Sequence, residues 1–325
     1  MGFLRHLLSR YQDICIQCHN DPDADALASA LGLYQYLTAH GARAQIVYGG
    51  PVKLNKFNLD LMVRQCQIPI RHVEVLPPAQ LLLVVDGQYG EGNVARFDAP
   101  AVAVIDHHFQ RIPDGDLVLV RSDYQSCATI VWELLKEEGW PVERDERLCV
   151  ALLYGLYTDT ASYADLYCKP DLAMYTSLTG NYPLLERLKK SCLTVEELMI
   201  TSDALQNHYF DTERCYAIIP AVHCEQVVLG IIGDLVIQVD QIRATIAYTE
   251  SDISYQISIR TCDESIQAER LAAAVCAGVG SGGGRSGKAG GRLFKEALRR
   301  QYGEGFDIFA VIKARMDQAV PPEAR

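Results

Sequence analysis

The sequence changes character abruptly at His19-Asn20-Asp21-Pro22-Asp23-Ala24-Asp25-Ala26, directly after an apolar run at residues 14–18. This stretch offers one imidazole and two carboxylates, on His19, Asp23 and Asp25, within a short piece of chain. Mn²⁺, Mg²⁺ and Zn²⁺ bind such mixtures of nitrogen and oxygen ligands. An apolar core, by contrast, does not accommodate unpaired carboxylates. The stretch therefore predicts a divalent-metal site immediately after a buried strand.

Length and composition indicate a globular protein of two domains. The chain has 325 residues, of which 49% are hydrophobic and 22% charged, as is usual for globular proteins. No apolar run approaches the roughly 20 residues of a membrane helix, and residues 1–10 are too polar for a signal peptide. We therefore expect no membrane partner. Eleven cysteines without regular spacing, many within apolar runs, are typical of reduced thiols in a cytoplasmic protein.

The net charge bounds the choice of substrate. A formal charge of −11 disfavours attachment to long nucleic acid, because a polyanion is attracted by clustered lysine and arginine. Bound cations would offset part of this excess where aspartates cluster. We therefore expect any nucleic-acid substrate to be short.

Strand and helix patterns alternate along the first half of the chain. Apolar, strand-like runs lie at residues 14–18, 45–48, 81–85 and 102–105. Helical patterns lie between and after them, at residues 26–39, 59–65 and 129–138. Short apolar strands separated by helices predict an α/β domain with a parallel sheet covered on both faces. Ligands of such sheets bind at the carboxyl ends of the strands.

The second half predicts a smaller α/β domain. A helical connector at residues 184–206 precedes strand patterns at 215–219, 242–249 and 255–260, with helices at 226–236 and 265–277. We expect a catalytic metal-binding domain at 1–190, a helical linker at 191–207 and a substrate-binding domain at 208–325. The active site is expected in the cleft between the two domains.

Further candidate ligands follow the other strands. Asp86 ends the run at 81–85, and Asp106-His107-His108 ends the run at 102–105. Asp159 instead follows a helical run at 148–156. Each site alone has a simpler explanation, since Asp25 is a candidate helix N-cap and Asp86-Gly87 a candidate turn. Four such sites in one domain, three of them at strand ends, favour a two-metal phosphoesterase centre.

The order of these motifs resembles the DHH phosphoesterase superfamily, which includes the exonuclease RecJ, manganese pyrophosphatases and the nanoRNases, oligoribonucleases that also remove phosphate from pAp. The resemblance rests on His-x-x-x-Asp-x-Asp at 19–25, Asp86, Asp106-His107-His108 and Asp159. The second half resembles the DHH-associated C-terminal domain, through Ser258-Ile259-Arg260 and Gly282-Gly283-Gly284.

This resemblance implies a role for each motif residue. One metal would be held by His19, Asp23 and Asp86. The other would be held by Asp25, Asp86, His107 and Asp159, with Asp86 as the bridge. Of the remaining catalytic residues, Asp106 would accept a hydrogen bond from a histidine, and His108 would face the substrate. Mn²⁺ is the expected cation, with Mg²⁺ or Co²⁺ as alternatives, and two cations about 3.5–4 Å apart would activate a water.

The resemblance also implies substrate-binding residues, which are His108, Arg260, Gly283, Gly284, Arg285 and Lys288. The glycine-rich run at 280–291 has three interpretations: an anion-binding loop that leads into a helix at 292–300, a flexible linker, or a P-loop. Ala289 stands where a P-loop needs a hydroxyl, so we favour the anion-binding loop. Superfamily members usually carry a histidine where this chain has Arg285, and an alanine in place of Lys288, which leaves substrate choice open.

One further motif is set aside. Cys15-Ile16-Gln17-Cys18-His19 matches a haem-attachment pattern. Haem c is attached outside the cytoplasm, and no export signal is recognisable.

The leading hypothesis is a cytoplasmic, manganese-dependent phosphoesterase of the nanoRNase type, acting on short oligonucleotides or small nucleotide phosphates such as pAp. The alternatives are a polyphosphatase or pyrophosphatase, a phosphodiesterase of cyclic or linear dinucleotides, and a non-catalytic nucleotide-binding sensor. A homodimer is left open.

Overall fold

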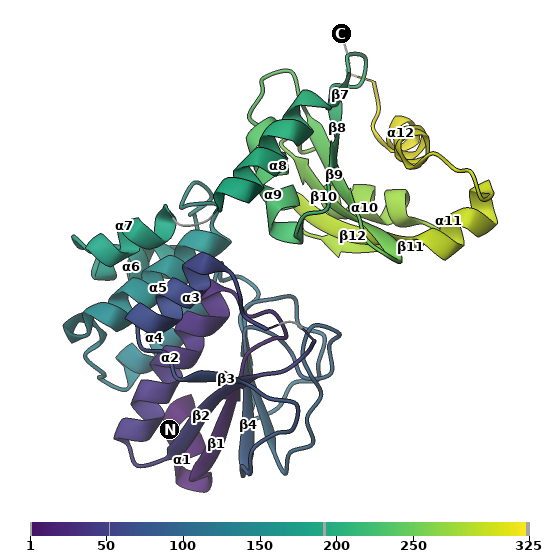
Figure 1. Ribbon diagram of the computed structural model, residues 1–325. Coiled ribbons are helices and arrows are strands. Elements are labelled where there is room, and N and C mark those ends of the chain that lie inside the picture. The colour runs from purple at the N-terminus through teal and green to yellow at the C-terminus, as the bar shows by residue number, and fades with distance from the viewer. Residues whose placement is uncertain (1, 52, 191–192, 323–325) are drawn as a thin grey trace. The chain divides into compact units, whose positions relative to one another are not determined.

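The computed structural model describes residues 2–51, 53–190 and 193–322. The chain forms two compact units, Met1–Cys192 and Leu193–Arg325, drawn in Figure 1. The predicted linker begins at residues 191–192, which lie outside the described residues. Most of its remainder is a helix, α8 (Val195–Gln206), which groups with the second unit.

The first unit is built on a parallel sheet of six strands, in the order β3-β2-β1-β4-β5-β6. The strands are β1 (Asp13–Gln17), β2 (Arg43–Tyr48), β3 (Ile70–His72), β4 (Leu81–Val85), β5 (Val102–Asp106) and β6 (Val118–Val120). The predicted α/β class and parallel sheet are confirmed. The edge strands β3 and β6 were not predicted, because each has three residues, none of them fully buried.

The two faces of this sheet are covered differently. The helices are α1 (Phe3–Arg10), α2 (Ala24–Ala39), α3 (Phe57–Gln65), α4 (Cys127–Glu137), α5 (Glu146–Asp159), α6 (Lys169–Leu178) and α7 (Pro183–Lys189), with a 3₁₀ turn at Val142–Arg144. They gather on one face (Figure 1) and share a core with Ile14, Ile16 and Leu83. The other face packs against irregular chain, where Val94 and Phe97 cover Val84. Because both faces are covered, β4 is buried along its whole length.

The second unit is built on a mixed sheet, in the order β11-β12-β10-β9-β8-β7. Its strands are β7 (Tyr209–Asp211), β8 (Tyr216–Ala221), β9 (Ala244–Glu250), β10 (Ser254–Thr261), β11 (Gly280–Gly284) and β12 (Lys288–Phe294). Only β8 and β9 pair in parallel among the described strands of this sheet. Helices α8 and α9 (Gln226–Val236) cover one face, while α10 (Ala268–Cys276) and α12 (Ile308–Ala319) cover the other, and α11 (Lys295–Tyr302) follows β12.

The glycine-rich run at 280–291 is not a loop. It forms the hairpin β11–β12, whose turn is Arg285-Ser286-Gly287, and the following helix begins at Lys295. The predicted loop conformation and the helix from residue 292 are therefore wrong, as are the linker and P-loop alternatives, whereas anion binding at this run stays a prediction. The reason is packing: a Cβ on Gly282 would lie 2.9 Å from the Sγ of Cys276 and 2.9 Å from the carbonyl of Ala272. Helix α10 approaches the hairpin so closely that only glycine fits there.

This packing makes a testable distinction between two neighbouring glycines. We expect Gly282→Ala to destabilise the second unit by about 1–3 kcal/mol, because the added methyl group collides with α10. The matched control is Gly283→Ala, whose Cβ would meet no atom within 4 Å and should shift stability by only a few tenths of a kcal/mol. Thermal unfolding of the full chain measures both, and equal shifts would contradict this account of the hairpin.

Candidate metal centre

The carboxyl ends of three neighbouring strands define the site. Strands β1, β4 and β5 are adjacent and parallel, so the residues that follow them meet at one edge of the sheet. His19 follows β1, Asp86 follows β4, and His107 follows β5. The start of α2 adds Asp23 and Asp25, and α5 ends at Asp159.

All six predicted metal ligands come together at this edge. His19, Asp23 and Asp86 form one group whose ligand atoms lie within 4.8 Å of one another. Asp25, His107 and Asp159 form a second such group. A third group joins Asp86 to His107 and His108. The first two groups contain the residues that were predicted for the two metals, except that the second lacks the shared Asp86.

Asp86 belongs to the first group and also faces His107 of the second. Its Oδ2 is 3.6 Å from Nε2 of His19, and its Oδ1 is 3.4 Å from Nε2 of His107. His19 Nε2 is also 3.8 Å from Asp23 Oδ1. His107 Nε2 lies 3.3 Å from Asp159 Oδ2 and 3.9 Å from Asp25 Oδ2. One carboxylate thus faces two imidazoles with its two oxygens, the arrangement expected of a bridging ligand.

The backbone of Asp86 is held in an unusual conformation. Its φ is 54°, in the left-handed region that residues other than glycine rarely occupy. Its amide nevertheless continues the sheet pattern by donating to the carbonyl of Ile105 at 3.0 Å. Such conformations cost of order 1–3 kcal/mol and persist where surrounding structure imposes them, often at functional sites. Aspartate and asparagine tolerate this region better than most residues.

Two aspartates at the start of α2 have different structural roles. Asp23 is the N-cap, with its Oδ1 accepting from the amides of Asp25 and Ala26 at 3.0 and 3.1 Å. The alternative that Asp25 caps its own helix is therefore wrong. Asp25 is fully buried and instead accepts from the amides of Cys127 and Ala128, at 2.6 and 2.8 Å. Those amides form the first turn of α4, which stabilises a negative charge.

Two buried polar atoms at the centre of the site test whether a cation fits. Asp86 Oδ1 and His107 Nε2 have no hydrogen-bond partner within the described part of the chain. The opposite ring nitrogen of His107, Nδ1, is 3.3 Å from the carbonyl of Tyr124 and donates to it, which leaves Nε2 as a possible ligand. Buried polar atoms are rarely left unpaired. A divalent cation bound here would pair with both atoms. This set of ligand atoms therefore fits a divalent cation.

The pKa values of the ionisable side chains at this centre reflect both their burial and the charges of their neighbours. Burial alone would lower the pKa of the His107 imidazole, but Asp86, Asp25 and Asp159 outweigh it and raise the pKa to about 10. For His19, Asp23 and Asp86 likewise overcome burial and raise the pKa to about 9. Burial and the charges of Asp86 and Asp159 hold the pKa of Asp25 well above its usual range. Bound cations would replace the protons that these groups retain.

Asp106 and His108 form a separate pair beside this centre. Asp106 is fully buried, and its Oδ1 lies 2.8 Å from Nδ1 of His108. Its Oδ2 accepts from Gln88 Nε2 at 2.7 Å. Burial would raise the pKa of Asp106, yet hydrogen bonds from His108 and Gln88 keep it below its ordinary value. The side chain of His108 is 49% exposed, so its imidazole is oriented but accessible.

Several residues of this site had no recognisable sequence signal. Gln88 orients Asp106, the Tyr124 carbonyl orients His107, and the amides of Cys127 and Ala128 hold Asp25. Ser126, the N-cap of α4, was the one available signal, since it marks where free helix amides would lie.

The remaining predicted residues belong to the second unit. Arg260 on β10 donates from Nε to Asp234 Oδ1 at 2.6 Å, and its side chain is 13% exposed. Lys288 Nζ lies 3.5 Å from the same oxygen. The structure therefore brings Arg260 and Lys288 together around Asp234, which was not predicted. Gly283 and Gly284 lie on β11, where they pair with Gly290 and Ala289 of β12, and Arg285 lies in the hairpin turn.

Comparison with known proteins matches the first unit to a family. Residues 13–156 match the DHH family, N-terminal domain. This chain is 31% identical over 159 residues to the bifunctional oligoribonuclease and PAP phosphatase NrnA of Thermus thermophilus, a match covering 49% of this chain and 47% of that protein. The matched region thus spans about half the length of NrnA.

Solved structures share the fold over nearly the whole chain. An exopolyphosphatase-related protein from Bacteroides fragilis has a TM-score of 0.74 at 17% identity, covering 98% of this chain and 95% of that one. RecJ from Thermus thermophilus in complex with Mn²⁺ has a TM-score of 0.57 at 15% identity, covering 99% of this chain and 54% of that one.

None of the helices described here is long and apolar enough to cross a bilayer.

We expect Mn²⁺ to stabilise the chelator-treated protein, because it would bind the folded site and not the unfolded chain. At a free concentration about 100 times the Kd, the gain is about 2.7 kcal/mol. Asp86→Asn should lose at least half of this gain in thermal unfolding. The control Asp98→Asn makes the same change at an exposed position and should keep the full gain. Equal gains in both variants would place the cation elsewhere.

Proposed function

We propose that the chain is a metal-dependent phosphoesterase of short oligonucleotides or small nucleotide phosphates, since residues 13–156 match the DHH family, N-terminal domain. The observation that carries this proposal is the Asp86 carboxylate, which faces His19 with one oxygen and His107 with the other. The oligoribonuclease and phosphatase activities in the name of the NrnA relative support the substrate class.

The donor groups assign ligands to two proposed cations. One would be held by His19, Asp23 and Asp86. The other would be held by Asp25, Asp86, His107 and Asp159. Once bound, two cations would acidify a water and neutralise the charge of a phosphate group. Mn²⁺ is the proposed cation, since carboxylate and imidazole ligands suit it, and Mg²⁺ is the alternative, since RecJ was solved with either cation.

His108 is the chain's own candidate for contact with substrate. Asp106 accepts a hydrogen bond from its Nδ1 at 2.8 Å, which fixes the ring orientation. Its Nε2 is then left to hold a proton toward a phosphate oxygen or the leaving oxygen. Because the side chain is half exposed, a substrate reaches this nitrogen without rearrangement of the core.

The cations of the second unit are proposed to bind the part of the substrate that is not cleaved. Arg260 and Lys288 share Asp234, so a phosphate group would join or displace an existing ion pair. Within the described residues, the guanidinium of Arg285 has no partner. Arginine binds phosphate bidentately, so this turn suits a second phosphate.

Arg285 and Lys288 also support a second candidate function. Arg285 and Lys288 add two positive charges near the hairpin turn, which favours a polyphosphatase or pyrophosphatase. A dinucleotide phosphodiesterase and a non-catalytic sensor are the remaining alternatives. Turnover with Mn²⁺ of pApA, pAp, a cyclic dinucleotide, pyrophosphate and polyphosphate separates these hypotheses, and no turnover of any of them would refute the enzyme.

We also propose a cytoplasmic location. All described cysteines are free thiols, and most are buried. Burial raises the pKa of Cys15 and Cys66 to about 12, so these thiols are structural and unreactive. The homodimer stays a prediction.

Asp86→Asn is the sharpest test of the proposed bridge. Asparagine tolerates the left-handed backbone at this position, so the variant should fold normally. It removes the charge shared between the two groups of ligands, and we expect turnover of the best substrate of the panel to fall at least a thousandfold. Steady-state kinetics with Mn²⁺ measures this, and retention of a tenth of the wild-type rate would refute the shared ligand.

The two neighbouring histidines should respond differently to substitution. His107→Ala removes a buried ligand candidate and should lower the bound metal measured by elemental analysis. His108→Ala should leave metal content near normal but reduce kcat by about a hundredfold, as expected for a group that holds a proton toward substrate. The reverse pattern of metal content would exchange the proposed roles of the pair.

A further inference from the structure

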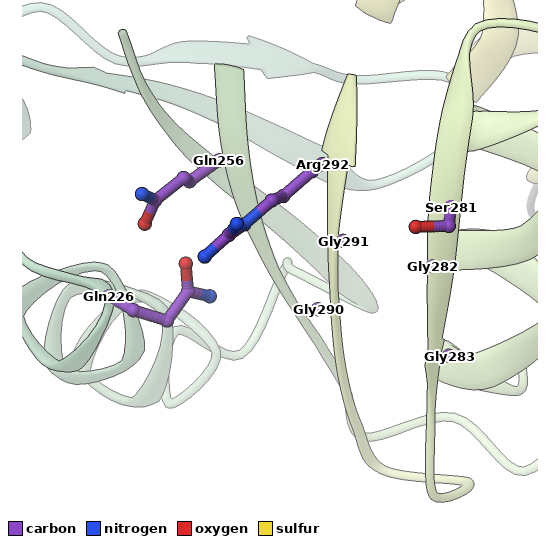
Figure 2. Close-up of a pocket in the computed structure, with 8 residues that line it drawn as sticks. All are labelled: Gln226, Gln256, Ser281, Gly282, Gly283, Gly290, Gly291 and Arg292. Carbon is purple, nitrogen blue, oxygen red and sulfur yellow. The ribbon is translucent and has the colours of Figure 1, made fainter. Parts of the chain in front are cut away.

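A groove of about 460 Å³ lies on the second unit, along the β11–β12 hairpin and the first turn of α9. Its volume falls within the range of small-molecule sites. Arg292 pairs with Ser281 on one side and with Gln256 on the other, so these three side chains lie side by side on one face of the sheet. Figure 2 shows Gln226, Gln256 and Arg292 directed toward one another across the groove.

The floor of the groove is bare backbone. Gly283 pairs with Gly290, and both line the groove. At Gly282 the fold itself demands glycine, because a Cβ would collide with α10, but a Cβ at Gly283 would meet no atom within 4 Å. The protein's own packing therefore does not explain Gly283. A strand glycine of this kind often marks the close approach of a ligand, and a floor without side chains lets a flat ring lie against it.

The walls of the groove carry planar polar groups. The guanidinium of Arg292 has no hydrogen-bond or ion-pair partner in the described part of the chain, and it is exposed. Gln226 donates from Nε2 to the carbonyl of Ile257 at 3.0 Å, which orients its amide and leaves Oε1 free to accept. Gln256 offers a second amide. The groove thus combines one cation with two neutral groups that both donate and accept, which suits the edge of a nucleobase better than a phosphate.

The spacing of Lys288 and Arg292 also favours a nucleotide over a simple phosphate. Lys288 and Arg292 lie on the same face of β12, four residues apart, which separates their Cα atoms by about 14 Å. Lys288 shares Asp234 with Arg260, so two cations already gather at one end of the face. This Cα separation is longer than pyrophosphate and is compatible with a phosphate joined through a sugar to a base.

We propose that this groove binds the base of a nucleotide substrate, with a preference for guanine. The inference rests on the proposed function and specifies its substrate. Arginine donates two parallel hydrogen bonds to O6 and N7 of guanine, whereas adenine presents one acceptor and one donor at those positions. Arg292 is accordingly the specificity-determining residue, and Gln226 and Gln256 contact the remaining edge.

Calorimetry on the full chain with chelator, which stops metal-dependent hydrolysis, tests this directly. The probes are GMP, AMP, ribose 5-phosphate and pyrophosphate. We expect the wild-type chain to bind GMP more tightly than AMP, and both more tightly than ribose 5-phosphate. Arg292→Met should raise the Kd of GMP about tenfold or more, because two charge-assisted hydrogen bonds are lost, and that of pyrophosphate less than twofold. Gly283→Val should weaken GMP comparably by filling the floor.

The matched control is Arg270→Met, which removes the same charge from an exposed position of α10, on the opposite side of the sheet. It should change neither Kd. Equal weakening of GMP and pyrophosphate by Arg292→Met would overturn the proposal in favour of a phosphate site, as would wild-type binding of ribose 5-phosphate as tight as GMP. Binding of GMP through Arg292 without turnover of any substrate would refute the phosphoesterase and leave this inference standing.

Discussion

Four carboxylates and two imidazoles are held within a few ångströms of one another at the edge of a parallel sheet, and the first unit is arranged to keep them there. Asp25 and Asp86 are almost completely buried, and each faces further acidic groups. Such a cluster repels itself unless cations or protons neutralise it. The raised pKa values of His19 and His107 report how strongly positive charge is favoured at this place.

The short segment 124–129 supports two ligands of the second group, His107 and Asp25. The carbonyl of Tyr124 orients His107, and the amides of Cys127 and Ala128 hold Asp25. The segment is fixed in turn by Asp171, a fully buried carboxylate that accepts from the amide of Gln125 and the hydroxyl of Thr129. Hydrogen bonds from this segment to Asp171 of α6 therefore help to place Asp25 and His107, although neither α4 nor α6 carries a candidate ligand.

In the second unit, glycines of the β11–β12 hairpin allow close packing against α10. Cys276 of α10 sits against Gly282 and Gly291, so the hairpin and helix pack without room for side chains. The opposite face of the same hairpin is left open beside α9, where Gln226 and Arg292 line the groove. One run of glycines thus serves close packing on one face and leaves a flat, accessible backbone on the other.

The sequence by itself determined the α/β class, the four central strands of the first sheet and the residues at their carboxyl ends. These follow from local apolar runs, because parallel neighbouring strands must end at the same edge. The structure alone decided that Asp23 caps α2 while Asp25 binds α4, that Gln88 orients Asp106, and that the glycine run is a hairpin. The bond from the amide of Cys127 to Asp25 joins residues 102 positions apart, and the bond from Gln88 to Asp106 joins residues 18 positions apart. Local patterns carry no record of such partners, so only tertiary packing reveals them.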